Sequence, residues 1–284
     1  MTQRLARLDG RPRLGLALSG GAARGMAHVG VLKVFEEEGV RVDCVAGTSA
    51  GALVGGALAA GMTSEEIAKI ARGMRWRDLG RMTLSRLGIQ SSALMEDYVR
   101  ARFPVTRFEE LRIPFAAVAT DLHTGEAVVM RDRGDVAFAI RASCALPGWY
   151  VPVTDPEGRQ LVDGGLVANL PVSVARSLGA DSVVAVDVNY EGAKFLGKPA
   201  TMVGVLLQSM VVVQQTAVLH ERRLADVCIS PAVGHLRWDE MKRTDEFIAA
   251  GIESARAAIP AVKELLEQSP SEDESRLQLH HARD

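Results

Sequence analysis

Glycine is concentrated near one end of this chain. Twelve of its 27 glycines fall within residues 10–61 of a 284-residue sequence. A disordered or collagen-like chain would spread its glycine along its length, and a coiled coil would carry almost none, so these classes are excluded. The class that remains is a globular protein whose first fifth needs unusual backbone geometry, which glycine adopts without a steric penalty.

Charge and cysteine usage narrow the function further. The formal net charge is −2, and no stretch has a dense cluster of Lys and Arg, which argues against nucleic acid as a partner. The three cysteines, Cys44, Cys144 and Cys228, are widely separated among apolar neighbours, so we expect buried free thiols and neither disulfides nor a metal site. The N-terminus lacks the apolar core of a signal peptide. We therefore expect a cytoplasmic protein that needs no cofactor.

Two stretches lack charged residues over about the length of a membrane span. They are Cys44–Ser64, rich in small residues, and Pro199–Leu219, which contains several glutamines. We interpret both as buried core helices. The open alternative is a peripheral contact of residues 202–213 with the inner surface of a membrane.

Short apolar runs alternate with helical patterns, which is typical of a mainly parallel sheet covered by helices. The expected strands are Leu14–Ser19, Asp43–Gly47, Phe115–Thr120, Glu126–Met130, Gln160–Val162 and Asp181–Val188. The expected helices are Ala27–Glu38, Ala50–Ala60, one beginning after Thr63, Asp135–Ser143, Pro171–Leu178, 200–225 and 244–267. We expect an extension over 1–12, a catalytic domain over 13–189, a helical part of the same domain over 190–268 and a disordered tail over 269–284.

A G-x-S-x-G sequence lies between an expected strand and a helix of small residues. It reads Gly47-Thr48-Ser49-Ala50-Gly51. This context is that of a nucleophile elbow, in which a strained turn exposes a serine and tiny neighbours let other backbone approach. The alternative is a serine that only caps the following helix.

A glycine-rich turn after the first strand could bind an oxyanion through its backbone N–H groups. Its residues of interest are Gly20, Gly21, Ala22, Arg24 and Gly25. Arg24 either binds an anionic part of the substrate or pairs with an acid at the sheet edge. The turn is not a P-loop, because Met26-Ala27 follow where a P-loop needs Lys and Ser or Thr. A dinucleotide site is a disfavoured alternative, because Ala22 breaks its fingerprint.

The general base is the third element. Among the six histidines only His235 lies in a loop that could supply a triad histidine. Asp163-Gly164-Gly165 follows the strand Gln160–Val162 and could present a carboxylate instead. Apolar surroundings would raise the pKa of that aspartate and make it a better base, although such a sequence alone is usually just a turn.

These blocks, in this order, resemble the bacterial stand-alone members of the patatin-like phospholipase family. The resemblance runs over residues 13–189 and includes LGLALSGGAARGMAHVG, VAGTSAGALVGG, IPFAAVATDL, IRASCALPGWYVPV and LVDGGLVANLP. It implies a three-layer α/β/α fold and a catalytic Ser–Asp dyad without histidine. Ser49 then matches the nucleophile, Asp163 the proton acceptor, and the turn from Gly20 to Gly25 the oxyanion loop.

One position departs from the pattern of the family, since Ala22 stands where a third glycine is common. An alanine still offers its N–H, and we expect the oxyanion hole to survive if Ala22 has a negative φ.

The expected function is hydrolysis of lipid, phospholipid or other carboxylic esters. An acyltransferase acting through the same acyl-Ser49 intermediate and a non-catalytic lipid-binding regulator are the alternatives. The physiological substrate and the oligomeric state are left open.

Overall fold

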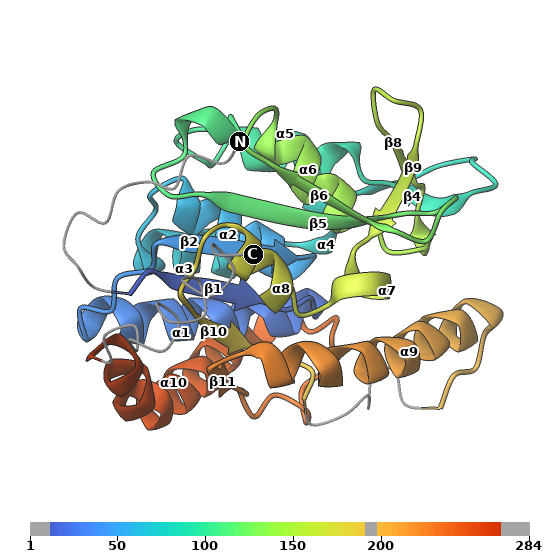
Figure 1. Cartoon of the computed structure of the whole chain (residues 1–284). Helices are drawn as coiled ribbons and strands as arrows, with labels where there is room; N and C mark the ends of the chain where they lie inside the picture. Colours follow the sequence, from blue (N-terminus) through green and yellow to red (C-terminus); the bar gives the residue numbers. More distant parts are fainter. Residues whose placement is uncertain (1–11, 191–197, 268–284) are drawn as a thin grey trace, which may run out of the picture.

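A mainly parallel sheet forms the centre of the molecule (Figure 1), which confirms the expected fold class. The computed structural model describes residues 12–190 and 198–267. The expected extension, apart from Pro12, and the expected tail lie outside these residues. Strand order is β11-β10-β1-β2-β5-β9-β8, and β6 also pairs with β5. The strands are β1 Leu14–Leu18, β2 Cys44–Thr48, β5 Phe115–Asp121, β6 Ala127–Arg131, β8 Val153–Thr154, β9 Gln160–Asp163, β10 Ser182–Val186 and β11 Val227–Ile229.

Helices cover both faces of this sheet. One face carries α1 Met26–Glu37, α2 Ala50–Ala59, α3 Ser64–Gly73, α5 Ala93–Arg100, α6 Val136–Ser143 and α10 Thr244–Glu267. The other carries α7 Gly165–Ala168, α8 Val172–Ser177 and α9 Met202–Leu224. Because side chains alternate along a strand, Leu16 packs in the larger core on the first face while Ala17 packs against the second.

The strands from β11 to β5 run parallel, whereas β6, β8 and β9 are antiparallel to their neighbours. This arrangement places the carboxyl ends of β1 and β2 at the same edge of the sheet. Both glycine-rich turns follow these ends, and β9 brings Asp163 opposite Ala119 of β5.

The expected elements match the observed ones within a few residues, but helix α5 and several short elements were not expected. A small sheet, ordered β3-β4-β7, consists of Arg81–Met82, Gly88–Ser91 and Gly148–Tyr150. Helix α4 is Trp76–Leu79, and single 3₁₀ turns cover Ala22–Gly25 (η1), Phe108–Glu110 (η2) and Met241–Arg243 (η3). Elements of two to four residues carry too few positions for a periodic pattern, which is why the sequence did not reveal them.

The two charge-free stretches behave differently. Helix α2 is largely buried, as expected. Helix α9 is not a buried core helix, which corrects the expectation, because several of its apolar side chains are half exposed or more. These are Met202, Val205, Leu206, Val212, Val213 and Leu219. In the described part of the chain no helix combines the length and apolarity needed to cross a membrane.

Candidate active site

Ser49 occupies a strained turn between β2 and α2. Its φ of 53° and ψ of −121° lie far from the ordinary regions for a residue with a side chain, and such a conformation costs about 1–3 kcal/mol. Its side chain makes no capping bond to α2, so the interpretation as a mere helix cap is wrong. The backbone N–H of Ser49 donates to Ser143 Oγ at 2.8 Å, and Ser143 Oγ donates to the Val118 carbonyl at 2.6 Å. Neighbouring elements thus hold the turn in place.

The glycines near this turn let neighbouring backbone approach closely, and they do not adopt unusual dihedral angles. The left-handed residues beside the site are Ala22 and Ser49, while Gly20, Gly25, Gly47 and Gly51 have no positive φ. A side chain on Gly47 would collide with the Gly51 carbonyl, and one on Gly51 with the Leu18 carbonyl. The close approach expected at Gly47 and Gly51 is therefore observed, whereas the general expectation that glycine supplies unusual dihedral angles does not hold for these four residues.

Asp163 is the last residue of β9, and its side chain contacts that of Ser49. Its side chain is almost completely buried, and the Gly165 N–H donates to its Oδ1 at 2.8 Å. Burial raises its pKa to about 6, while hydrogen bonds from the Ser49 hydroxyl and the Gly165 N–H act in the opposite direction. Gly164 lies against the Val118 carbonyl, so a side chain there would displace this turn.

The turn from Gly20 to Gly25 has two uncommitted donors. The N–H of Gly20 donates to the Asn169 carbonyl at 3.1 Å, and that of Arg24 donates to the Gly21 carbonyl at 3.1 Å. The N–H groups of Gly21 and Ala22 have no acceptor among the described residues, and both residues line the pocket that contains Ser49. These two groups are the ones available for an oxyanion.

Ala22 does not have the negative φ that we expected. Its φ is 51°, in the left-handed region where glycine is favoured. The direction of the Ala22 N–H depends on the peptide plane shared with Gly21, whereas φ rotates the chain after that bond. The positive φ therefore adds strain without removing the donor.

Arg24 fits neither of the two expected roles. The residue is buried, does not line the pocket, and has no carboxylate within ion-pair distance among the described residues. Its Nε donates to the Leu236 carbonyl at 3.0 Å, and its Nη1 reaches Asn189 Oδ1 at 3.5 Å. Burial lowers the pKa of this guanidinium. Arg24 thus braces the turn against two later segments of the chain.

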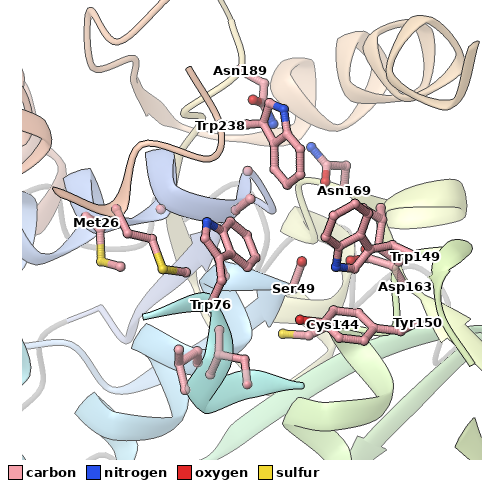
Figure 2. A pocket seen from close by; sticks show the side chains of 18 of the residues that line it. Met26, Ser49, Trp76, Cys144, Trp149, Tyr150, Asp163, Asn169, Asn189 and Trp238 are labelled. Atoms are coloured by element: carbon pink, nitrogen blue, oxygen red, sulfur yellow. The ribbon is translucent and has the colours of Figure 1, made fainter. Parts of the chain in front are cut away.

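Residues 236–239 are bound to the site through their carbonyl groups. Besides the Leu236 carbonyl, the Trp238 carbonyl accepts the Ala23 N–H at 2.9 Å, and the Asp239 carbonyl accepts Trp76 Nε1–H at 3.0 Å. These bonds place the Trp238 indole over the pocket (Figure 2). The sequence gives no signal for this segment, since a contact through a backbone carbonyl does not depend on the type of side chain.

Ser49 and Asp163 share one apolar pocket, called here the main pocket, with a cavity volume of about 110 Å³. All three tryptophans of the chain line it. The Trp238 ring meets those of Trp76 and Trp149 edge to face, with centroids 5.4 and 6.1 Å apart. Five methionines complete much of the wall, namely Met26, Met74, Met95, Met210 and Met241. Such walls suit an acyl chain.

The cysteines are all free, but only Cys44 is fully buried as expected, while Cys144 and Cys228 are partly exposed. Cys144 lines the main pocket and contacts the Ser49 side chain. Burial, with the nearby Asp163 charge, raises the pKa of the Cys144 thiol far above its usual range. It is therefore a neutral neighbour of Ser49.

No histidine joins this site within the described residues. His235 is exposed and outside the main pocket, and His28 is buried behind the turn, where its Nε2 donates to the Ser19 carbonyl at 2.8 Å. Burial lowers the pKa of His28 to about 4. In the same part of the chain, no group of three His, Cys, Asp or Glu side chains could hold a metal ion.

A family model described as patatin-like phospholipase matches residues 16–176. An uncharacterized NTE family protein of Mycobacterium tuberculosis is 40% identical over 181 residues, which are 63% of this chain and 49% of that protein. The human patatin-like phospholipase domain-containing protein 6 is 36% identical over 192 residues, 65% of this chain and 14% of that protein. The chain thus spans about half the length of the mycobacterial relatives it matches.

Solved structures show the same fold. VipD from Legionella pneumophila aligns with a TM-score of 0.58 at 15% identity, covering 91% of this chain and 67% of VipD. The type III effector protein ExoU aligns with a TM-score of 0.50 at 15% identity, covering 92% of this chain and 56% of the effector chain.

Proposed function

The chain belongs to the patatin-like phospholipase family, and from this premise we propose that it hydrolyses carboxylic esters of lipids with Ser49 as nucleophile. The observation that carries the proposal is the contact between the strained Ser49 and the buried Asp163 inside an apolar pocket. Asp163 is the proposed proton acceptor, and the N–H groups of Gly21 and Ala22 are the proposed oxyanion donors.

The reaction proceeds in two steps. Asp163, with a pKa of about 6, is mostly ionised at neutral pH and accepts the Ser49 proton as Oγ attacks the ester carbonyl. The two N–H groups stabilise the resulting oxyanion, and Asp163 returns the proton to the alcohol as the carbon–oxygen bond breaks. Water then attacks the acyl-Ser49 ester and loses a proton to Asp163, which returns it to Ser49 Oγ as the acyl–oxygen bond breaks and the carboxylic acid leaves.

The apolar wall of the main pocket supports a fatty acyl group as the acid part of the ester. Burial of methylene groups against the tryptophans and methionines contributes about 0.8 kcal/mol for each group. This contribution predicts a preference for longer acyl chains up to the length that the pocket admits.

Hydrolysis of p-nitrophenyl octanoate tests the proposal. We expect Ser49→Ala and Asp163→Asn each to lower kcat by about 10³-fold or more, since nucleophile and base act as a unit. His235→Ala is the matched control and keeps the wild-type rate, because His235 is exposed outside the pocket. An unchanged rate in Ser49→Ala or Asp163→Asn contradicts the dyad. Labelling of wild type but not Ser49→Ala by a fluorophosphonate distinguishes an enzyme from a non-catalytic lipid-binding protein.

We also propose that α9 rests on a lipid surface on the cytoplasmic side of a membrane. One side of α9 contributes Met210, Val211 and Gln214 to the main pocket, while Val205, Leu206 and Val213 are half exposed or more. A lipid surface would cover these apolar groups beside the pocket entrance. Co-sedimentation with phosphatidylglycerol and phosphatidylethanolamine vesicles tests this, with Val213→Gln expected to reduce binding. Equal binding by the variant and wild type contradicts it.

A further inference from the structure

A second cavity, called here the side pocket, lies beside the main pocket. Its cavity volume is about 390 Å³, and it is bordered mainly by α9 and by residues around Asn189. Four residues line both cavities, namely Asn169, Asn189, Val211 and Gln214. The side pocket therefore lies next to the proposed reacting groups, and no step of the proposed mechanism involves it.

Three carboxamide side chains of the side pocket lack partners. The side-chain amide of Asn169 makes no hydrogen bond within the described residues, although the residue is only 3% exposed. The amides of Gln214 and Gln215, both half-buried, also have none in that part of the chain. Carboxamides that line a cavity without a protein partner are free to bind a polar ligand. Each carboxamide offers two donors and an acceptor with no charge.

Asn169 lies near both the proposed nucleophile and the proposed proton acceptor. A Cβ atom on Gly20 would be 2.6 Å from Asn169 Oδ1 and 3.1 Å from Ser49 Cβ. One on Gly165 would be 3.0 Å from both Asn169 Oδ1 and Asp163 Oδ1. Figure 2 shows Asn169 near Asp163 and on the same side of Ser49 as Asn189. The carboxamides therefore begin where the alcohol of an ester on Ser49 would leave.

The charged side chains of the side pocket wall, within the described residues, are paired with each other. Arg222 Nη1 pairs with the buried Asp187 at 2.8 Å and donates to Ser230 Oγ at 3.1 Å. Its guanidinium also lies over the Tyr190 ring, 3.9 Å from the centroid. A phosphate would find no unpaired cation in this wall, whereas phosphate sites use unpaired Arg or Lys and backbone N–H groups.

We infer that the side pocket binds the alcohol part of the ester and that this alcohol is neutral and rich in hydroxyl groups, such as glycerol or a sugar. This inference rests on the proposed hydrolase function and narrows its substrate class. Hydroxyl groups donate to and accept from carboxamides equally well, and they need no counter-charge. A phosphate attached to the same alcohol places a charge in a wall whose own charges are already paired.

Three esters of one acid test the inference. They are 1-octanoylglycerol, 1-octanoylglycerol 3-phosphate and ethyl octanoate, compared by kcat/KM below their critical micelle concentrations. The alcohol leaves during acylation, and all three give the same acyl-enzyme, so differences in kcat/KM arise from the alcohol part, through its contacts and its leaving ability. We expect the glycerol ester to exceed the ethyl ester by about tenfold, which corresponds to two net hydrogen bonds, and to exceed the phosphate ester by at least as much.

Substitutions at Gln215 test the site itself, because Gln215 lines only the side pocket. Gln215→Leu should lower kcat/KM for octanoylglycerol about threefold more than for ethyl octanoate. Gln215→Arg adds an unpaired cation and should raise kcat/KM for the phosphate ester relative to the glycerol ester. Ser209→Leu and Ser209→Arg are the matched controls on α9, since Ser209 is exposed and lines neither pocket. They should change no ratio.

Two results overturn the inference. One is a wild-type preference for the phosphate ester or for ethyl octanoate, and the other is a set of ratios that the Gln215 variants leave unchanged. Hydrolysis of p-nitrophenyl octanoate separates this failure from failure of the proposed function. If Ser49-dependent hydrolysis persists while the preference is reversed, only the alcohol assignment is wrong. If no ester is cleaved, the hydrolase proposal itself fails.

Discussion

The two longest helices of the molecule have nearly equal length and opposite surroundings. Helix α10 has 24 residues and packs against α1, where Gly251 lies on the Ala27 carbonyl and Gly30 on the Ile248 carbonyl. Helix α9 has 23 residues, borders both pockets and leaves large apolar side chains in water. Close backbone contact lets α10 bury most of its apolar stripe, whereas α9 leaves several large apolar side chains half exposed or more. The difference indicates that α10 supports the fold and α9 serves the site.

The proposed reacting groups also set the pocket apart from the α1–α10 contact. Ser49 and Ala22 are held in left-handed conformations, and Asp163 is buried with a raised pKa. Each of these features costs folding free energy, and each lies at the pocket rather than under α10. The predictions that follow compare the two regions, beginning with the largest effect.

Bulk added at the α1–α10 contact should be the most damaging change. Gly251→Leu places a side chain against the Ala27 backbone, and we expect it to lower the free energy of unfolding by about 3 kcal/mol. Gly204→Leu is the matched change in α9, where the nearest atom to a new Cβ is Thr201 Oγ1 at 3.2 Å, and it should cost less than about 1 kcal/mol. Urea unfolding measures both values. Similar losses would mean that α9 is packed as tightly as α10.

Removing the charge of Asp163 should stabilise the protein while abolishing activity. Its folded pKa of about 6 lies above the unfolded value near 3.9, so the folded state loses stability as the pH rises through this window. Relative to wild type at the same pH, Asp163→Asn should gain up to about 3 kcal/mol at pH 8 and almost nothing below pH 4. Asp132→Asn, at an exposed position, is the control and should show no such trend. A loss of stability at pH 8 contradicts the assignment.

The rate of ester hydrolysis should follow the same titration. At pH values below the Asp163 pKa of about 6, protonation of Asp163 removes the base. The kcat/KM for p-nitrophenyl octanoate should then fall about tenfold for each pH unit. The rate should be level from about pH 7 to 8. If the acidic limb of the pH–rate profile shifts in His235→Ala, the base is a histidine instead.

Replacing Ala22 by glycine should have a small net effect. It relieves left-handed strain of about 1–2 kcal/mol, but glycine also increases the freedom of the unfolded chain by about 0.4–1 kcal/mol. We therefore expect the free energy of unfolding, measured by thermal unfolding, to rise by about 1 kcal/mol or less. Activity should be retained because residue 22 keeps its backbone N–H. Ala23→Gly, next to it and without positive φ, should lose stability by a similar amount. Equal effects at both positions would show that Ala22 is not strained.

Polar substitution on the exposed side of α9 should be the mildest change. Val213 is 58% exposed, so Val213→Gln should alter the free energy of unfolding by less than about 0.5 kcal/mol. Val262→Gln in α10, where Val262 is fully buried, should cost at least about 2 kcal/mol. Equal costs would remove the contrast between the two helices.

Much of the site was predictable from local sequence. Ser49 follows from a glycine-flanked turn between a strand and a helix, and Asp163 from a glycine-backed turn after a strand. By contrast, the brace from Arg24 to Leu236 joins residues 212 positions apart, and no local pattern marks it. The tryptophan wall joins Trp76, Trp149 and Trp238 from three separate segments, so the sequence did not reveal it either.

The sequence by itself determined the fold class, the order of the main strands and helices, and the two turns that carry Ser49 and the proposed oxyanion donors. These depend on short-range rules of periodicity, steric size and turn geometry, which act between residues close in the chain. Only the tertiary structure decided which N–H groups remain free, why the pKa of Asp163 is raised, and that α9 is exposed rather than buried. Hydrogen-bond competition, desolvation and packing arise between residues far apart in sequence, so they exist only once the chain has folded.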